Sequence, residues 1–91
     1  GNGHRERFPG LALAWESLRA APGSCAVLNA ANEVAVAAFL ERRIRFDQIH
    51  QVNRATLDRV QPDAPDGLDA LLALDARSRG SAQELVRVLA A

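Results

Sequence analysis

The stretch Cys25–Arg43 (CAVLNAANEVAVAAFLERR) constrains the fold most strongly, because it is rich in alanine and almost wholly apolar. A helix that is apolar over most of its circumference is surrounded by neighbouring elements. Alanine side chains also let those neighbours approach closely. We therefore predict a central buried helix that begins at Cys25 or Ala26, after Ser24 as N-cap, and ends at Arg42 or Arg43.

Two further segments have the apolar periodicity of helices. In Phe8–Ala20, Pro9 suits the first helical position, and apolar residues follow on one face at Leu11, Ala14, Trp15 and Leu18. The sequence Pro22-Gly23-Ser24 predicts a turn after this helix. The next helix is predicted over Asp47–Val60, where Asp47 suits the positive end of the helix dipole. Its inner stripe is Ile49, Val52, Thr56 and Val60, with Leu57 beside it.

A long last helix is predicted from Gly67 to about Leu89, with Asp66 as its cap. Its middle, Asp75–Ser81, is weak, because Gly80 costs about 1 kcal/mol relative to alanine. The helix is either continuous with a soft centre or broken near Arg79–Ser81. Four amphipathic helices with short connections predict an all-α domain, a small antiparallel four-helix bundle. We assign residues 8–91 to this domain and residues 1–7 to a flexible linker or a tag remnant.

Composition narrows the class of protein. The 91 residues suffice for one small domain, and 11 basic and 11 acidic residues leave a net charge of +0. This balance argues against nucleic acid or an anionic membrane as a partner. We expect no membrane span, since no apolar run approaches the roughly 18–20 residues that one needs. The single cysteine, Cys25, excludes an intrachain disulfide, and we expect a cytoplasmic protein.

Residues that could carry chemistry are sparse. The chain has no Gly-x-Gly-x-x-Gly turn for a dinucleotide, no lysine and no close acidic set for a divalent metal. We therefore predict no catalytic, cofactor-binding or metal-binding residue in this chain. His4 and His50 are too few for a metal site, and His50 is expected on the outer face of its helix. Cys25 is interpreted as a small residue at a helix start.

The polar residues of the central stretch form one set. Asn29, Asn32 and Glu33 are spaced i, i+3, i+4, which places them on one side of the helix. Buried polar groups need hydrogen-bond partners, so the favoured interpretation is a structural cluster that holds a neighbouring element. The alternative is docking of another domain. Asp75 and Arg79 are expected to form a surface pair. Arg42, Arg43 and Arg45 are interpreted as a solvated helix end rather than a phosphate site.

Leu28–Leu40 resembles the signature of the C-terminal domain in the 1-deoxy-D-xylulose 5-phosphate reductoisomerase family. Three other blocks agree in type and spacing, so the resemblance covers essentially Arg7–Leu89. These blocks are Arg7-Phe8-Pro9 with the leucines that follow it, Ile44-Arg45-Phe46 followed by Asp47-Gln48-Ile49, and the leucine-rich last segment with Asp75-Ala76 and Arg79.

The resemblance implies an oxidoreductase that depends on NADPH and on Mg²⁺ or Mn²⁺. Such an enzyme makes 2-C-methyl-D-erythritol 4-phosphate in the non-mevalonate isoprenoid pathway of bacteria and plastids. It also implies that the cofactor, metal and substrate residues lie in domains that this chain does not match. The chain would then be a non-catalytic support domain, with the catalytic domain of the parent enzyme as its partner. The alternative hypothesis is an independent helical module that binds another protein or itself.

Overall fold

Three α-helices make up the described part of the chain, residues 22–61 and 64–91 of a computed structural model. They are α3 (Pro22–Leu40), α4 (Phe46–Val60) and α5 (Leu68–Ala90). No strand occurs within these residues, which confirms the all-helical fold class. The helix predicted over residues 8–20 and the linker predicted over residues 1–7 lie outside the described residues.

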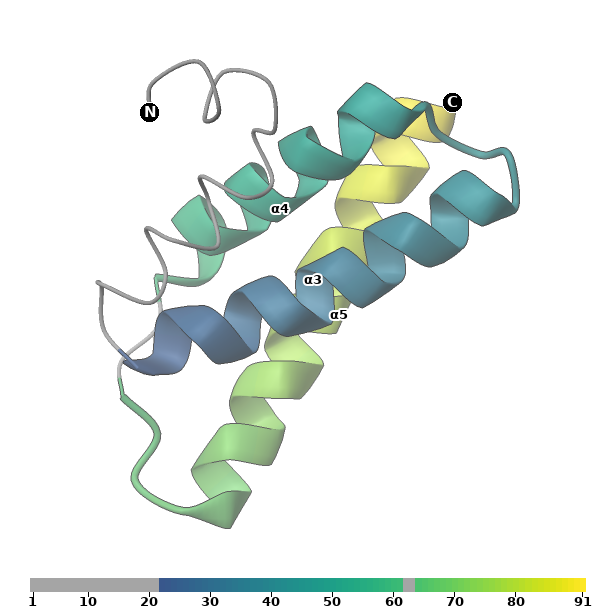
Figure 1. The fold of residues 1–91 in the computed structure, drawn as a ribbon. Helices are drawn as coiled ribbons and strands as arrows, with labels where there is room; N and C mark the ends of the chain where they lie inside the picture. The colour runs from purple at the N-terminus through teal and green to yellow at the C-terminus, as the bar shows by residue number, and fades with distance from the viewer. Residues whose placement is uncertain (1–21, 62–63) are drawn as a thin grey trace.

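The helix α3 is the centre of this arrangement, as its sequence predicts. It packs against both α4 and α5, which also contact each other. In Figure 1, α4 returns beside α3 after a short connection, and α5 passes behind α3. The side chains of α3 that are at most 2% exposed are Val27, Ala30, Ala31, Ala35 and Ala38.

The crossing of α5 over α3 follows from a spacing of four residues. On α5 the buried residues are Leu74, Ser78, Ala82 and Val86. Rows with this spacing on both helices interdigitate at an oblique angle of about 50°, and small side chains at the contact allow close approach. Figure 1 shows α5 crossing α3 obliquely. The antiparallel four-helix bundle is therefore not supported within the described residues, which form three helices.

The last helix is continuous through its weak centre. It runs for 23 residues, and the Ser78 hydroxyl, which is fully buried, donates a hydrogen bond to the Leu74 carbonyl at 2.7 Å. A serine can therefore occupy a core position because its own helix satisfies its hydroxyl. Of the two alternatives, the continuous helix is correct and the break near Arg79–Ser81 is wrong.

The helix starts differ from those predicted. The helix α3 begins at Pro22, where proline suits the first turn, so the predicted turn over Pro22-Gly23-Ser24 is wrong. Ser24 lies inside the helix at 6% exposure and is not its N-cap. The N-cap of α5 is Gly67, with φ of 149° and no side-chain capping bond, so Asp66 does not cap this helix.

A left-handed residue ends α3 earlier than predicted, at Leu40. Arg42 has φ of 61°. Its N–H donates to the Phe39 carbonyl, and the Arg43 N–H donates to the Ala38 carbonyl, both at 2.9 Å. This pair of bonds is the Schellman arrangement, which satisfies the last carbonyls of a helix. The chain then turns, and α4 starts at Phe46, one residue before its predicted start.

The hydropathy of α3 corrects one expectation. The 18 residues Gly23–Leu40 have a mean hydropathy of 1.4, so within the described residues one helix is long and apolar enough to cross a membrane. The expectation that no apolar run approaches this length is therefore wrong. Both other described helices pack on α3, and 39% of this window is buried. Its apolar character is accounted for by its place in the core.

Candidate functional site

Polar side chains of α3 form hydrogen bonds with both other described helices. We call this set the polar cluster. It contains the three residues singled out in the sequence and three that lie on the other helices. Its members are Asn29, Asn32 and Glu33 of α3, Asn53 of α4, and Asp75 and Arg79 of α5.

Arg79 is the residue that joins two helices in this cluster. One nitrogen of its guanidinium lies 2.8 Å from a carboxylate oxygen of Glu33, and its Nε lies 2.8 Å from Asp75. The hydrogen bond that Arg79 donates to Asp75, and then the one that it donates to Glu33, raises the pKa of Arg79 above its ordinary value. The guanidinium therefore stays protonated at any ordinary pH. The predicted Asp75–Arg79 pair is confirmed, whereas its extension to Glu33 was not foreseen.

The three residues predicted to act as one set divide between two neighbours. The amide of Asn29 donates to Glu33 at 3.3 Å, within α3. The Oδ1 of Asn32 accepts a hydrogen bond from the amide of Asn53 on α4 at 3.0 Å. All three are exposed, so the premise that they are buried is wrong. Their contacts nevertheless link α3 to both other helices, although their role in stability or docking stays a prediction.

The inner face of α4 is more polar than the sequence suggests. Asn53 is 3% exposed and Gln48 is 8% exposed. The prediction of the inner stripe missed Asn53, although its position gave a signal: it lies four residues after Ile49 and three before Thr56, both of which belong to that stripe. Gln48 accepts the backbone N–H of Arg45 at 2.7 Å, so its burial is explained by capping of α4.

His50 was predicted on the outer face of its helix, and this prediction is wrong. It is half-buried, and its Nδ1 is buried without a hydrogen-bond partner. The Oδ1 of Asn53 and the hydroxyl of Thr56 are also buried and unpaired. The three residues follow one another at a spacing of three along α4. Thr56 was predicted on the inner stripe and the position of Asn53 gave a signal, whereas the partial burial of His50 was not foreseen.

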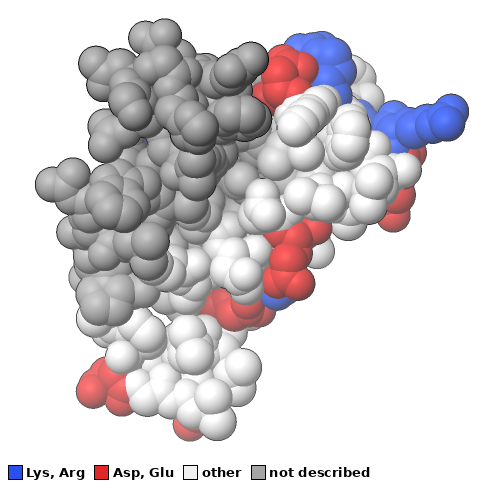
Figure 2. All heavy atoms as spheres, in the orientation of Figure 1, with Lys and Arg blue, Asp and Glu red and all other residues white. Residues whose placement is uncertain are grey.

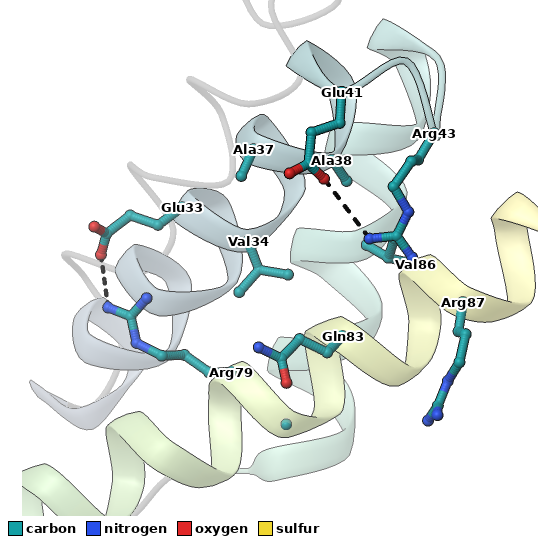
Figure 3. A pocket seen from close by; sticks show the side chains of 11 residues that line it. Glu33, Val34, Ala37, Ala38, Glu41, Arg43, Arg79, Gln83, Val86 and Arg87 are labelled. Atoms are coloured by element: carbon teal, nitrogen blue, oxygen red, sulfur yellow. Dashed lines mark hydrogen bonds and ion pairs between the residues drawn. The ribbon is translucent and has the colours of Figure 1, made fainter.

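An open groove of about 630 Å³ lies between α3 and α5, beside the polar cluster. Figure 3 shows Val34 and Gln83 along its middle. Glu33 is paired to Arg79 at one end, and Glu41 is paired to Arg43 at the other. The Arg43–Glu41 distance is 3.8 Å. Each of these carboxylates is thus already engaged by an arginine, and the lining of the groove mixes polar side chains such as Gln83 with apolar ones such as Val34.

Other candidate residues lie apart from the groove's chemistry. Cys25 is half-buried near the start of α3, as a structural residue would be. Arg42, Arg43 and Arg45 are exposed at the end of α3, as predicted for a solvated helix end. Within residues 22–61 and 64–91, no three His, Cys, Asp or Glu side chains gather closely enough to hold a metal ion. The described arrangement can join helices and accept hydrogen bonds.

Comparisons with known proteins show the family of this chain. The family described as DXP reductoisomerase C-terminal domain matches residues 2–81. The chain is 54% identical over 80 residues to a Burkholderia multivorans protein named 1-deoxy-D-xylulose 5-phosphate reductoisomerase, covering 88% of this chain and 20% of that protein. Proteins of the same name from Ralstonia nicotianae and Aromatoleum aromaticum are 52% identical over 80 residues and 53% over 73 residues.

Coverage of the relatives is as informative as identity. The match covers 88% of this chain and 20% of the Ralstonia protein, and 80% of this chain and 18% of the Aromatoleum protein. The chain thus spans about a fifth of the length of the curated relatives it matches. The family match extends over most of the chain, and the matching family is the terminal domain alone. The chain therefore belongs to the DXP reductoisomerase C-terminal domain family.

Proposed function

We propose that this chain is the supporting C-terminal domain of a 1-deoxy-D-xylulose 5-phosphate reductoisomerase. The enzyme would convert that phosphate to 2-C-methyl-D-erythritol 4-phosphate with NADPH and Mg²⁺ or Mn²⁺, in the cytoplasm of a bacterium. The observation that carries the proposal is the match of residues 2–81 to this one domain, together with 51–54% identity to the reductoisomerases of several bacteria. The catalytic part of the same enzyme would be its partner.

The described residues do not fit either the metal or the nucleotide. The carboxylates beside the groove are taken up by arginines: Glu33 and Asp75 by Arg79, and Glu41 by Arg43. A hard divalent cation needs several carboxylate or carbonyl oxygens free to coordinate it. NADPH would need a glycine-rich turn at a helix start, and the sequence contains none. We therefore assign no step of the reaction to this chain.

The contribution of the chain would be mechanical. The polar cluster links α3 to α4 through Asn32 and Asn53, and α3 to α5 through Glu33 and Arg79. These links fix the orientation of the crossing helices and hence the surface that they present. A rigid scaffold of this kind can hold a catalytic region in the geometry that its reaction requires.

A chimera tests this proposal. In the Burkholderia multivorans relative, the matching region would be replaced by this chain, and a second variant would lack the region altogether. We expect the chimera to oxidise NADPH with the natural substrate, and the truncated variant and the isolated chain to show no turnover. Thermal melting shows whether each protein is folded. A chimera that melts cooperatively but consumes no NADPH contradicts the proposal, and so does turnover by the chain alone.

A further inference from the structure

Two apolar patches are exposed at opposite ends of the described structure. The first is the corner patch at the junction of α3 and α4, formed by Phe39, Leu40 and Phe46, which are 36%, 73% and 65% exposed. The rings of Phe39 and Phe46 lie together, with their centroids 5.5 Å apart. This contact fixes two large apolar side chains in one place and leaves most of the second ring in solvent.

The second is the leucine patch on the first turns of α5. It consists of Leu68, Leu71 and Leu72, which are 68%, 38% and 58% exposed. Their spacing of i, i+3, i+4 puts them on one face of the helix. In Figure 1, this end of α5 extends beyond α3, far from the α3–α4 junction. Clusters of exposed apolar side chains commonly mark interaction surfaces.

The net charges beside the two patches have opposite signs, although at the corner patch Arg43 and Arg45 are paired with Glu41 and Asp47. The corner patch adjoins Arg42, Arg43 and Arg45, against which stand the carboxylates of Glu41 and Asp47, so three positive and two negative charges leave +1. The leucine patch adjoins two exposed carboxylates, Asp66 and Asp69, neither of which forms an ion pair with a described residue. Figure 2 shows blue and red side chains together at the upper right end, whereas the charged side chains seen at the lower end are red.

From this complementarity we propose that the corner patch of one copy of the chain docks on the leucine patch of a second copy. The inference goes beyond the supporting role proposed above, because it concerns contacts between copies of this domain. The contact is head to tail, so a pair of docked copies still has one free corner patch and one free leucine patch. Such heterologous contacts extend into longer assemblies unless their rotation closes a ring.

The size of the patches sets the strength of this contact. Stable interfaces bury about 1,200–2,000 Å² in total, and three side chains from each partner bury much less. We therefore expect weak association, with a dissociation constant of about 0.1–1 mM. Because opposite charges border the patches, added salt should weaken the association further.

Sedimentation equilibrium of the 91-residue chain tests the proposal. Between about 10 µM and about 1 mM, its average mass should rise and should not stop at the dimer unless a ring closes. Leu72→Asp and Phe46→Asp should each remain monomeric over this range. Val88→Asp is the matched control, because Val88 is an apolar residue of α5 that is 66% exposed and belongs to neither patch. It should associate as the unmodified chain does. Circular dichroism shows whether each variant is folded.

A mixture of the two variants distinguishes this contact from any other. Leu72→Asp keeps its corner patch and Phe46→Asp keeps its leucine patch, so an equimolar mixture should form a dimer that grows no further. Self-association of either variant alone would show that copies meet through like patches and would overturn the proposal. A chain that stays monomeric at the highest concentration, or a mixture that does not dimerise while the unmodified chain associates, would also overturn it.

Discussion

Arg79 of α5 lies 2.8 Å from Glu33 of α3, although 46 positions separate them in the sequence. The same guanidinium holds Asp75 of its own helix at 2.8 Å. One side chain therefore contacts a carboxylate on each of the two helices. The pair closes one end of the groove, as Figure 3 shows. This geometry makes a link between helices the simplest role for the polar cluster.

The hydrogen bond between Asn32 and Asn53 should contribute measurably to stability. Asn32→Leu removes the acceptor of a buried amide, and an unpaired buried group costs about 1–3 kcal/mol. We expect the free energy of unfolding, measured with urea, to fall by that amount. The double variant with Asn53→Leu should recover part of the loss, because the amide of Asn53 is then no longer buried without its partner. An unchanged midpoint in Asn32→Leu would show that the bond contributes nothing.

Gly80 is a position where the protein should be easy to stabilise. It lies inside α5, and a Cβ built there meets no atom within 4 Å. Gly80→Ala should raise the free energy of unfolding by about 1 kcal/mol, because alanine restricts the unfolded chain and favours the helix. Gly67→Ala is the control. A Cβ at Gly67 also meets no atom within 4 Å, but the φ of this residue is 149°, so the substitution should destabilise the protein. Equal effects of the two changes in thermal melting would refute this account.

Arg42 occupies a backbone conformation that suits glycine better. Its φ of 61° costs a residue with a Cβ about 1 kcal/mol. Arg42→Gly should therefore raise the melting temperature, by roughly 4–8 °C for each kcal/mol in a domain of this size. Arg43 lies next to Arg42 but has no positive φ. Arg43→Gly should therefore lower the melting temperature, because glycine gives the unfolded chain more freedom. If both substitutions lowered the melting temperature equally, this would contradict a left-handed conformation of Arg42 at the end of α3.

The pair formed by Arg45 and Asp47 predicts a dependence on pH. The hydrogen bond from Arg45, at 3.0 Å, holds the pKa of Asp47 below its ordinary value of 3.8. A lowered pKa in the folded state adds stability above the ordinary value, and this stability disappears as the pH falls through the lowered value. Urea unfolding of the unmodified chain and Asp47→Asn should differ most near neutral pH and converge in strong acid. A difference that grows on acidification would contradict this sign.

The helices themselves could be predicted from the sequence because their signals are local. The alanine-rich stretch predicts α3, and the stripe of Ile49, Val52 and Thr56 predicts α4 to within one residue at its start. The ends were harder to predict. The end of α3 depends on Arg42 adopting a left-handed conformation, which arginine seldom does. The family was also accessible, since four short blocks agreed in spacing and the match to residues 2–81 confirms it.

The arrangement of the helices could not be predicted from the sequence, and the reason is physical. Amphipathic patterns predict which face is buried, but the crossing angle depends on which rows of side chains interdigitate. Ser78 and Ala82 make the contact row of α5, and a serine in a core row is not predicted by hydropathy. The link from Glu33 to Arg79 depends on that crossing, so its prediction requires the tertiary structure.

The central claim is that this domain supports a catalytic region without supplying a reacting group. Its most direct test is the turnover number of the active chimera carrying Arg79→Met, measured well below the melting transition. We predict a lower melting temperature, because the link between α3 and α5 is lost, and a turnover number unchanged within about twofold. An unchanged melting temperature with turnover reduced about 100-fold or more, the loss typical of a missing acid or base, would contradict the claim.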